Sequence, residues 1–170
     1  MSEQGQRAAI VGQSRGGSIA KVLARRHPDL VCGVVTLGSP QLDPLAVHPL
    51  VRLQVEAVAR LGSLGAPGLF KRSCLEDECC ALFWEELGQP LPRGVDLISV
   101  YSRSDGIVDW RSCLDPHAGK QVEIDASHCG MAVSAPAWRA VADALGGFQR
   151  AEARRRAAAK GRDRRFPRAA

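Results

Sequence analysis

The chain has 170 residues, and 45% of them are hydrophobic, which is enough for one domain with a buried core. No run of about eighteen apolar residues occurs, which excludes a membrane-spanning helix, and residues 1–6 lack the pattern of a secretory signal, so a cytoplasmic location is the default expectation. The formal net charge is +5, but nine basic and only two acidic side chains fall in residues 149–170. We therefore expect a slightly acidic body over residues 1–148 and a basic tail over 149–170.

The Ala- and Arg-rich tail is expected either to extend the last helix or to be disordered. Its clustered arginines are not interleaved with aromatic residues, so nucleic-acid binding is disfavoured. Among the six cysteines, Cys32 lies in an apolar run and is expected in the core. Cys74, Cys79 and Cys80 do not have the spacing of a zinc site, and a disulfide within that segment is the alternative to free thiols.

The first predicted elements are a short buried strand over residues 8–11 and a helix over residues 15–26, joined by a sharp turn. The turn reads Gly12-Gln13-Ser14-Arg15-Gly16, which matches the G-x-S-x-G nucleophile elbow. In such an elbow a strained backbone lifts the serine hydroxyl clear of the sheet. The two glycines are expected to let the strand and the helix pass close to each other.

The following residues predict a βαβ unit and then a helical excursion. An apolar run over 30–37 predicts a strand covered on both faces. Residues 41–93 are punctuated by prolines and contain two helical stretches, near 49–61 and 78–87. Further strands are predicted over 95–101 and 121–124, followed by an amphipathic helix over 136–148. The predicted fold class is α/β, with about four mostly parallel strands, flanking helices and a helical insertion.

A carboxylate and an imidazole follow the last two predicted strands. Asp105 comes just after the third strand and His128 just after the fourth, so both should lie at the edge where open α/β sheets place their sites. The chain order Ser14, Asp105, His128 is the order of the serine–acid–histidine triad in α/β-hydrolases. Such a triad activates a serine hydroxyl, because the imidazole takes its proton and the carboxylate orients the ring. Asp109 is the alternative acid, whereas the other histidines (His27, His48 and His117) lie at a helix end or in proline-flanked loops.

Four stretches, GQSRGG, VVTLGSP, YSRSDGIVDW and IDASHCGM, resemble the elbow, a strand end, the acid loop and the histidine loop of the α/β-hydrolase superfamily, in its lipase and carboxylesterase branch. The resemblance covers about residues 7–147. It implies Ser14 as nucleophile, His128 as base, Asp105 as acid and the Arg15 backbone N–H as an oxyanion donor. It also casts residues 41–93 as a lid over the site.

The implied activity is hydrolysis of a small-molecule carboxylic ester or a lipid-like acyl substrate, with no cofactor and no metal. Acyl transfer and thioester hydrolysis use the same triad and stay as alternatives. Phe70, Phe83 and Trp84 would give the lid an apolar surface suited to acyl chains, although core packing is the commoner use of such residues.

The sequence departs from the family before the elbow, where a complete member has further strands and a loop that donates a second oxyanion N–H. Loss of one such donor slows catalysis by about 10²–10³-fold. We therefore expect a longer native protein, a second chain that supplies the strands, or a weakly active or inactive hydrolase fragment. The first strand would then be an exposed edge, which favours self-association.

Overall fold

The computed structural model describes residues 6–43, 46–73 and 78–165, without the side chains of residues 78–79 and 159–165. Four strands form one sheet, in the order β1 (Ala8–Gln13), β2 (Val31–Leu37), β3 (Asp96–Tyr101) and β4 (Lys120–Glu123). All three neighbouring pairs are parallel, with Val11 opposite Val35 and Val100 opposite Val122. The carboxyl ends of the four strands therefore lie at one edge of the sheet.

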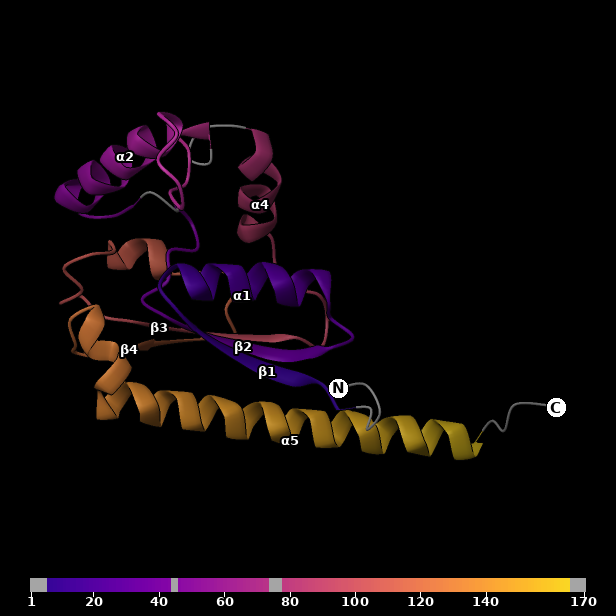
Figure 1. The fold of residues 1–170 in the computed structure, drawn as a ribbon. Coiled ribbons are helices and arrows are strands. Elements are labelled where there is room, and N and C mark those ends of the chain that lie inside the picture. Colours follow the sequence, from indigo (N-terminus) through magenta and orange to yellow (C-terminus); the bar gives the residue numbers. More distant parts are fainter. Residues whose placement is uncertain (1–5, 44–45, 74–77, 166–170) are drawn as a thin grey trace.

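Helices cover both faces of this sheet (Figure 1). Helix α1 (Arg15–Arg26) packs on one face and helix α5 (Ala135–Arg165) on the other. The core beneath α5 is continuous across β2 and β3 and includes Val35, Val100 and Phe148. Gly33 is required here, because a Cβ at this position would lie 2.6 Å from the Phe148 ring. This arrangement confirms the predicted α/β fold class.

The element boundaries differ from those predicted at the two edge strands. β1 continues to Gln13, and β4 begins one residue earlier than expected, at Lys120. The local apolar pattern predicts a buried β1, whereas the lack of preceding strands predicts an exposed edge. Ala9 and Val11 are exposed, because β1 has a neighbour on one side only among the described strands, so the second expectation holds. Two short 3₁₀ helices, η1 (Trp110–Cys113) and η2 (Cys129–Val133), were not predicted.

Helix α5 continues well beyond the predicted end at Phe148 and runs through most of the basic tail to Arg165. Of the two alternatives for the tail, the structure shows a helical extension up to that residue. An ion pair between Arg7 and Glu152, with 2.5 Å between Arg7 Nη2 and Glu152 Oε2, ties the helix to the chain just before β1. The hydrogen bond from Arg7 lowers the pKa of the Glu152 carboxyl, against a smaller opposing effect of burial.

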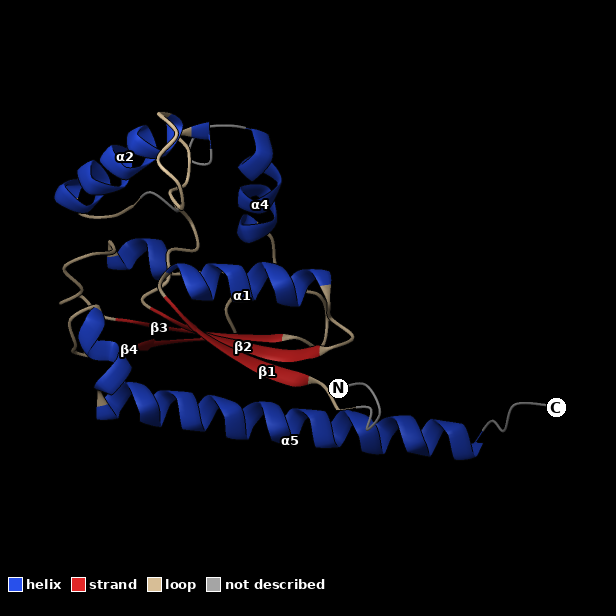
Figure 2. Ribbon diagram, in the orientation of Figure 1, coloured by secondary structure: helices blue, strands red, loops and turns tan. Residues whose placement is uncertain are grey.

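The insertion after β2 forms an outer layer on the α1 side of the sheet (Figure 2). It contains α2 (Pro49–Ser63) and α4 (Glu78–Gly88), and α4 packs on α1. Pro49 and the His48 side chain form the start of α2, where His48 Nδ1 accepts a hydrogen bond from the Leu50 N–H at 3.3 Å. A disulfide within the Cys74–Cys80 segment is the alternative to free thiols, and Cys74 and the Cys79 side chain lie outside the described residues, so this alternative is untested. No helix within the described ranges is both long and apolar enough to cross a membrane.

Candidate active site

The turn between β1 and α1 holds Ser14 in a rare backbone conformation. Its φ of 53° and ψ of −132° make it the only non-glycine residue with positive φ in the described part of the chain. The turn is fixed on both sides, since the Ser14 N–H donates to Leu37 O at 2.8 Å and Ser14 O accepts from the Gly17 N–H at 3.0 Å. Such strain persists only where the surroundings impose it, and it is concentrated at functional sites.

The close approach of strand and helix at this turn depends on Gly12 and Gly17. A Cβ on Gly12 would lie 2.6 Å from Gly16 O and from the Gly17 backbone, and a Cβ on Gly17 would lie 2.1 Å from Ser39 Oγ. A Cβ on Gly16 would meet nothing within 4 Å. The expectation that Gly16 allows the close approach is therefore wrong. A Cβ on Gly16 would point into open space, and it is the next residue, Gly17, whose missing Cβ allows the close approach.

Asp105 follows β3 and is held by the backbone of its own loop. Its Oδ1 atom accepts hydrogen bonds from the N–H groups of Ile107 and Val108, both at 2.9 Å. Its Oδ2 atom lies 2.7 Å from His128 Nδ1, and the Asp105 side chain is only 1% exposed. Burial raises the pKa of this carboxyl, but the hydrogen bonds from His128, Val108 and Ile107 outweigh it and hold the pKa below its usual range. The buried carboxylate is thus poised to stay ionised and to orient the ring.

The loop that carries His128 is tied to the elbow and to the acid loop by two side chains outside the predicted triad. The Gln13 amide, next to Ser14, donates to the His128 backbone O at 2.6 Å. The buried Ser102 hydroxyl accepts from the N–H groups of Ser104 and Ala126, at 3.1 and 3.2 Å, and so joins the acid loop to the histidine loop. These contacts bring the three predicted residues to one sheet edge.

Gln13 and Ser102 were not among the predicted site residues. Gln13 occupies a free position of the elbow motif, where any residue is allowed, and Ser102 reads as an ordinary strand-end serine. The sequence shows that Gln13 precedes Ser14 and that Ser102 follows β3. Their hydrogen-bond partners, His128 and Ala126, are distant in sequence and become neighbours only in the fold.

The Ser14 hydroxyl makes no hydrogen bond to another described residue, and catalytic hydrogen bonds are commonly absent or long without substrate. The Arg15 N–H belongs to the first turn of α1, where backbone N–H groups have no partner within the helix and favour an anion. The Arg15 guanidinium lies over the Trp84 ring, 5.4 Å from its centroid, and so links the elbow to the insertion.

The competing residues have other structural roles. The Asp109 carboxylate accepts from the Arg111 N–H at 3.0 Å and caps η1, so it does not contact His128. His48 caps α2, and the His27 backbone N–H closes α1 by donating to Leu23 O. The His117 backbone N–H donates to Asp115 Oδ1.

Two of the three aromatic residues of the insertion contact each other. Phe83 and Trp84 pack edge to face, with 4.8 Å between their centroids, whereas Phe70 is 41% exposed. A hollow of about 280 Å³ lies between the start of α2 and the acid loop and is lined in part by His48, Asp105 and Val108.

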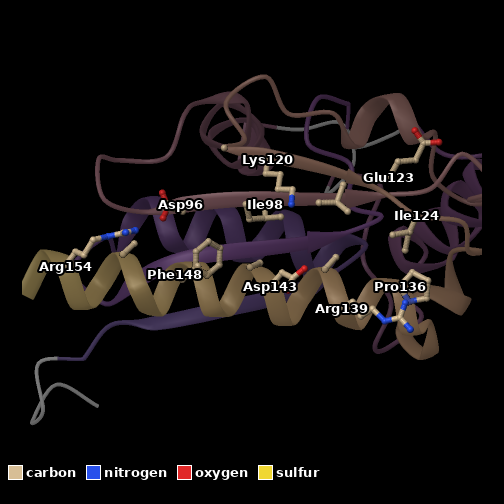
Figure 3. Close-up of a pocket in the computed structure, with 16 residues that line it drawn as sticks. Asp96, Ile98, Lys120, Glu123, Ile124, Pro136, Arg139, Asp143, Phe148 and Arg154 are labelled. Atoms are coloured by element: carbon tan, nitrogen blue, oxygen red, sulfur yellow. The ribbon is translucent and has the colours of Figure 1, made fainter.

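A second hollow, of about 630 Å³, lies between α5 and the strands β3 and β4 (Figure 3). Its floor is apolar and includes Ile98, Val122 and Phe148, and its rim carries charges of both signs. None of Ser14, Asp105 and His128 lines it, so its size alone does not make it the reaction site. Among the described residues, no cluster of three or more His, Cys, Asp or Glu side chains could hold a metal ion.

No protein-family model matches the chain, and no curated protein is similar to it in sequence. Solved structures are similar in fold. Alpha/beta hydrolase domain-containing protein 10 from mouse is 15% identical, with a TM-score of 0.51, and the match covers 88% of this chain and 65% of that protein. The esterase domain of a Rhodothermus marinus protein is 22% identical, with a TM-score of 0.52 and coverage of 84% and 60%. Methylketone synthase I from tomato is 12% identical, with a TM-score of 0.51 and coverage of 85% and 72%.

The chain spans less than two thirds of the length of the first two of these proteins. At this level of identity the similarity concerns the fold and leaves the reaction open. The chain has a partial α/β-hydrolase fold, as the parallel four-stranded sheet, its flanking helices and these similarities show.

Proposed function

We propose that the chain is a serine hydrolase that cleaves carboxylic esters or lipid-like acyl substrates through an acyl-enzyme. The observation that carries this proposal is the buried Asp105–His128 pair, with 2.7 Å between Asp105 Oδ2 and His128 Nδ1. The positive φ of Ser14 and the hydrogen bond from its neighbour Gln13 to the His128 backbone O support it. Hydrolases among the structural neighbours support the general class of reaction.

In the proposed reaction, Ser14 Oγ attacks the acyl carbon while His128 Nε2 takes its proton. The Arg15 N–H donates to the oxyanion of the tetrahedral intermediate. His128 then gives the proton to the departing alkoxide, and the acyl group stays on Ser14. Water deprotonated by His128 releases the acid and restores the serine. Asp105 keeps the proton on Nδ1 of the neutral ring and stabilises the imidazolium.

Gln13 and Ser102 act in this proposal as positioning residues. They fix the backbone of the histidine loop relative to the elbow and to the acid loop, and they do not touch the reacting atoms. Acyl transfer to an alcohol and thioester hydrolysis are sibling reactions that the same residues would support, because only the nucleophile or the leaving group changes.

Turnover of short- and long-chain p-nitrophenyl esters tests the proposal. We expect Ser14→Ala to abolish turnover and Asp105→Asn to lower kcat by about 10³–10⁴-fold, because the ring loses its tautomer and its counter-charge. Asp109→Asn is the matched control, since this exposed carboxylate caps η1 in the same loop. Equal rates for the wild type and Ser14→Ala would refute the esterase proposal.

A second candidate role, action by association, is favoured by the position of β1 at an edge of the sheet. Val11 on this strand is 39% exposed, and an open strand edge is a template for pairing. Light scattering tests this role, with Val11→Lys as the variant. A monomeric wild-type protein would contradict self-association through β1, and a dimer that Val11→Lys dissociates would support it.

A further inference from the structure

Helix α1 carries four basic side chains, and three of them bond to oxygen atoms of α4 or of the residues that follow it. The pairs are Lys21 with Leu87 O, Arg25 with Pro90 O and Arg26 with the Glu86 carboxylate, at 2.6, 2.6 and 2.7 Å. These contacts hold α4 on the side of α1 that faces away from the sheet (Figure 1). The position of α4 relative to α1 is therefore fixed by charged groups.

The fourth basic side chain, Arg15, has a different environment. It is exposed and makes no hydrogen bond or ion pair to an oxygen atom of another described residue. Its guanidinium lies over the Trp84 ring, 5.4 Å from the centroid, and the Phe83 ring packs edge to face against Trp84. An aromatic ring attracts the positive charge but offers no oxygen acceptor. The N–H donors of this guanidinium therefore stay available to an anion, while the ring on α4 holds the guanidinium in place.

Arg15 also lies directly beside the proposed nucleophile. It follows Ser14 in the elbow, and consecutive Cα atoms are about 3.8 Å apart. None of the described carboxylates on the acid loop and α4 pairs with this arginine: Asp105 contacts His128, Asp109 caps η1, Glu86 pairs with Arg26 and Glu85 is exposed. A cation beside the reacting serine that has no counter-charge among the described residues attracts an anionic group of the substrate.

We propose that the Arg15 guanidinium makes this site selective for esters that carry a carboxylate a few bonds away from the ester group. The inference rests on the proposed hydrolase function and adds to it the class of substrate. A guanidinium presents parallel N–H donors that match the two oxygens of a carboxylate, and such charge-assisted hydrogen bonds are among the stronger ones. A neutral ester of the same length has no such acceptor and leaves these donors to water.

Two matched pairs of esters test the selectivity, and in each pair a carboxylate replaces a terminal methyl group. Monoethyl adipate and ethyl hexanoate differ in this way on the acyl part, and 6-acetoxyhexanoate and hexyl acetate differ on the alcohol part. The readout is the ratio of kcat/KM values within a pair, so that an effect of a variant on both esters cancels. We expect Arg15→Gln to lower this ratio at least about tenfold in one pair or both, and added salt to lower it in the wild type.

The matched control is Arg26→Gln, which removes the same charge from the same helix and also breaks a contact with α4. It should keep the wild-type ratio, and circular dichroism checks that both variants fold. Binding is measured separately from turnover by ligand-observed NMR titration of the Ser14→Ala chain with the same four esters. Here Ser14→Ala/Arg15→Gln should bind the carboxylate ester at least about tenfold more weakly than Ser14→Ala does.

The outcomes separate this inference from the hydrolase proposal. Turnover with ratios that Arg15→Gln leaves unchanged in both pairs would overturn the inference and leave the hydrolase proposal standing. Binding of a carboxylate ester that depends on Arg15, without turnover of any ester, would support the anion site and count against the hydrolase. Without turnover, equal binding by the two Ser14→Ala chains would overturn the inference. An equal loss of selectivity in Arg26→Gln would assign the effect to the overall charge of α1 and would also overturn it.

Discussion

Two adjacent glycines at the elbow should respond to the same substitution with opposite sign. In Gly17→Ala the new methyl carbon would lie 2.1 Å from Ser39 Oγ and 2.8 Å from Gly12 O. Neither atom is free to move. Gly12 O belongs to the backbone, and the Ser39 side chain is fully buried and donates a hydrogen bond from its hydroxyl to Leu37 O. Overpacking of this kind costs about 1–3 kcal/mol, and we expect the upper end.

In Gly16→Ala the new carbon would meet nothing within 4 Å, while the helix loses a flexible residue in its first turn. The expected result is a gain of up to about 1 kcal/mol. Urea denaturation at unchanged m-value measures both differences. In thermal melts, Gly17→Ala should lower Tm by about 6–12 °C, given about 2–4 °C per kcal/mol for a domain of this size. Equal destabilisation by the two variants, or a neutral Gly17→Ala, would refute the account of the turn.

Three further predictions concern buried charges and thiols. Lys21→Met should cost about 3–5 kcal/mol in urea denaturation, because the Asp115 carboxylate, buried with the Lys21 ammonium at 1% exposure, would lose its counter-charge. Asp105→Asn should be less stable than the wild type, and the difference in unfolding free energy should be complete above about pH 5 and should shrink below about pH 4. The reason is that a carboxyl whose pKa is lowered in the folded state stabilises the fold only while it is ionised. Urea midpoints at several pH values measure this difference. Maleimide should label the exposed Cys129 in the native protein and spare Cys113, because burial raises the pKa of the Cys113 thiol to about 12.

Each of these predictions has a result that would count against it. A stable Lys21→Met variant would mean that the ion pair is not required. A stability difference for Asp105→Asn that is constant with pH would contradict the ionised carboxylate. For the thiols, native labelling of Cys113, mapped by peptide mass spectrometry and compared with Cys113→Ser, would contradict its burial.

Much of this fold could be predicted, because local patterns of apolar residues, prolines and strand ends indicate its elements. The apolar run that became β2 is buried at every position, and Pro49 after His48 marks the start of α2 as expected. Strand-end positions placed Asp105 and His128 on the same edge, because parallel strands end together. The geometry of the Asp105–His128 pair follows from this topology.

Other features depend on contacts between distant parts of the chain. The requirement for Gly17 instead of Gly16 comes from Ser39, which lies after the next strand. The continuation of α5 past Phe148 is supported by Arg7, which lies near the other end of the chain and forms an ion pair with Glu152. Neither partner is adjacent in sequence, so no local pattern indicates the pairing.

Reaction of the chain with a fluorophosphonate is the direct test of Ser14 as nucleophile, because the probe reports an activated serine whatever the natural substrate. Peptide mass spectrometry locates the adduct. We expect an adduct on Ser14 in the wild type and much slower labelling in His128→Asn, with labelling in Asp109→Asn unchanged. An unlabelled Ser14, or a labelling rate that does not depend on His128, would contradict the proposed triad.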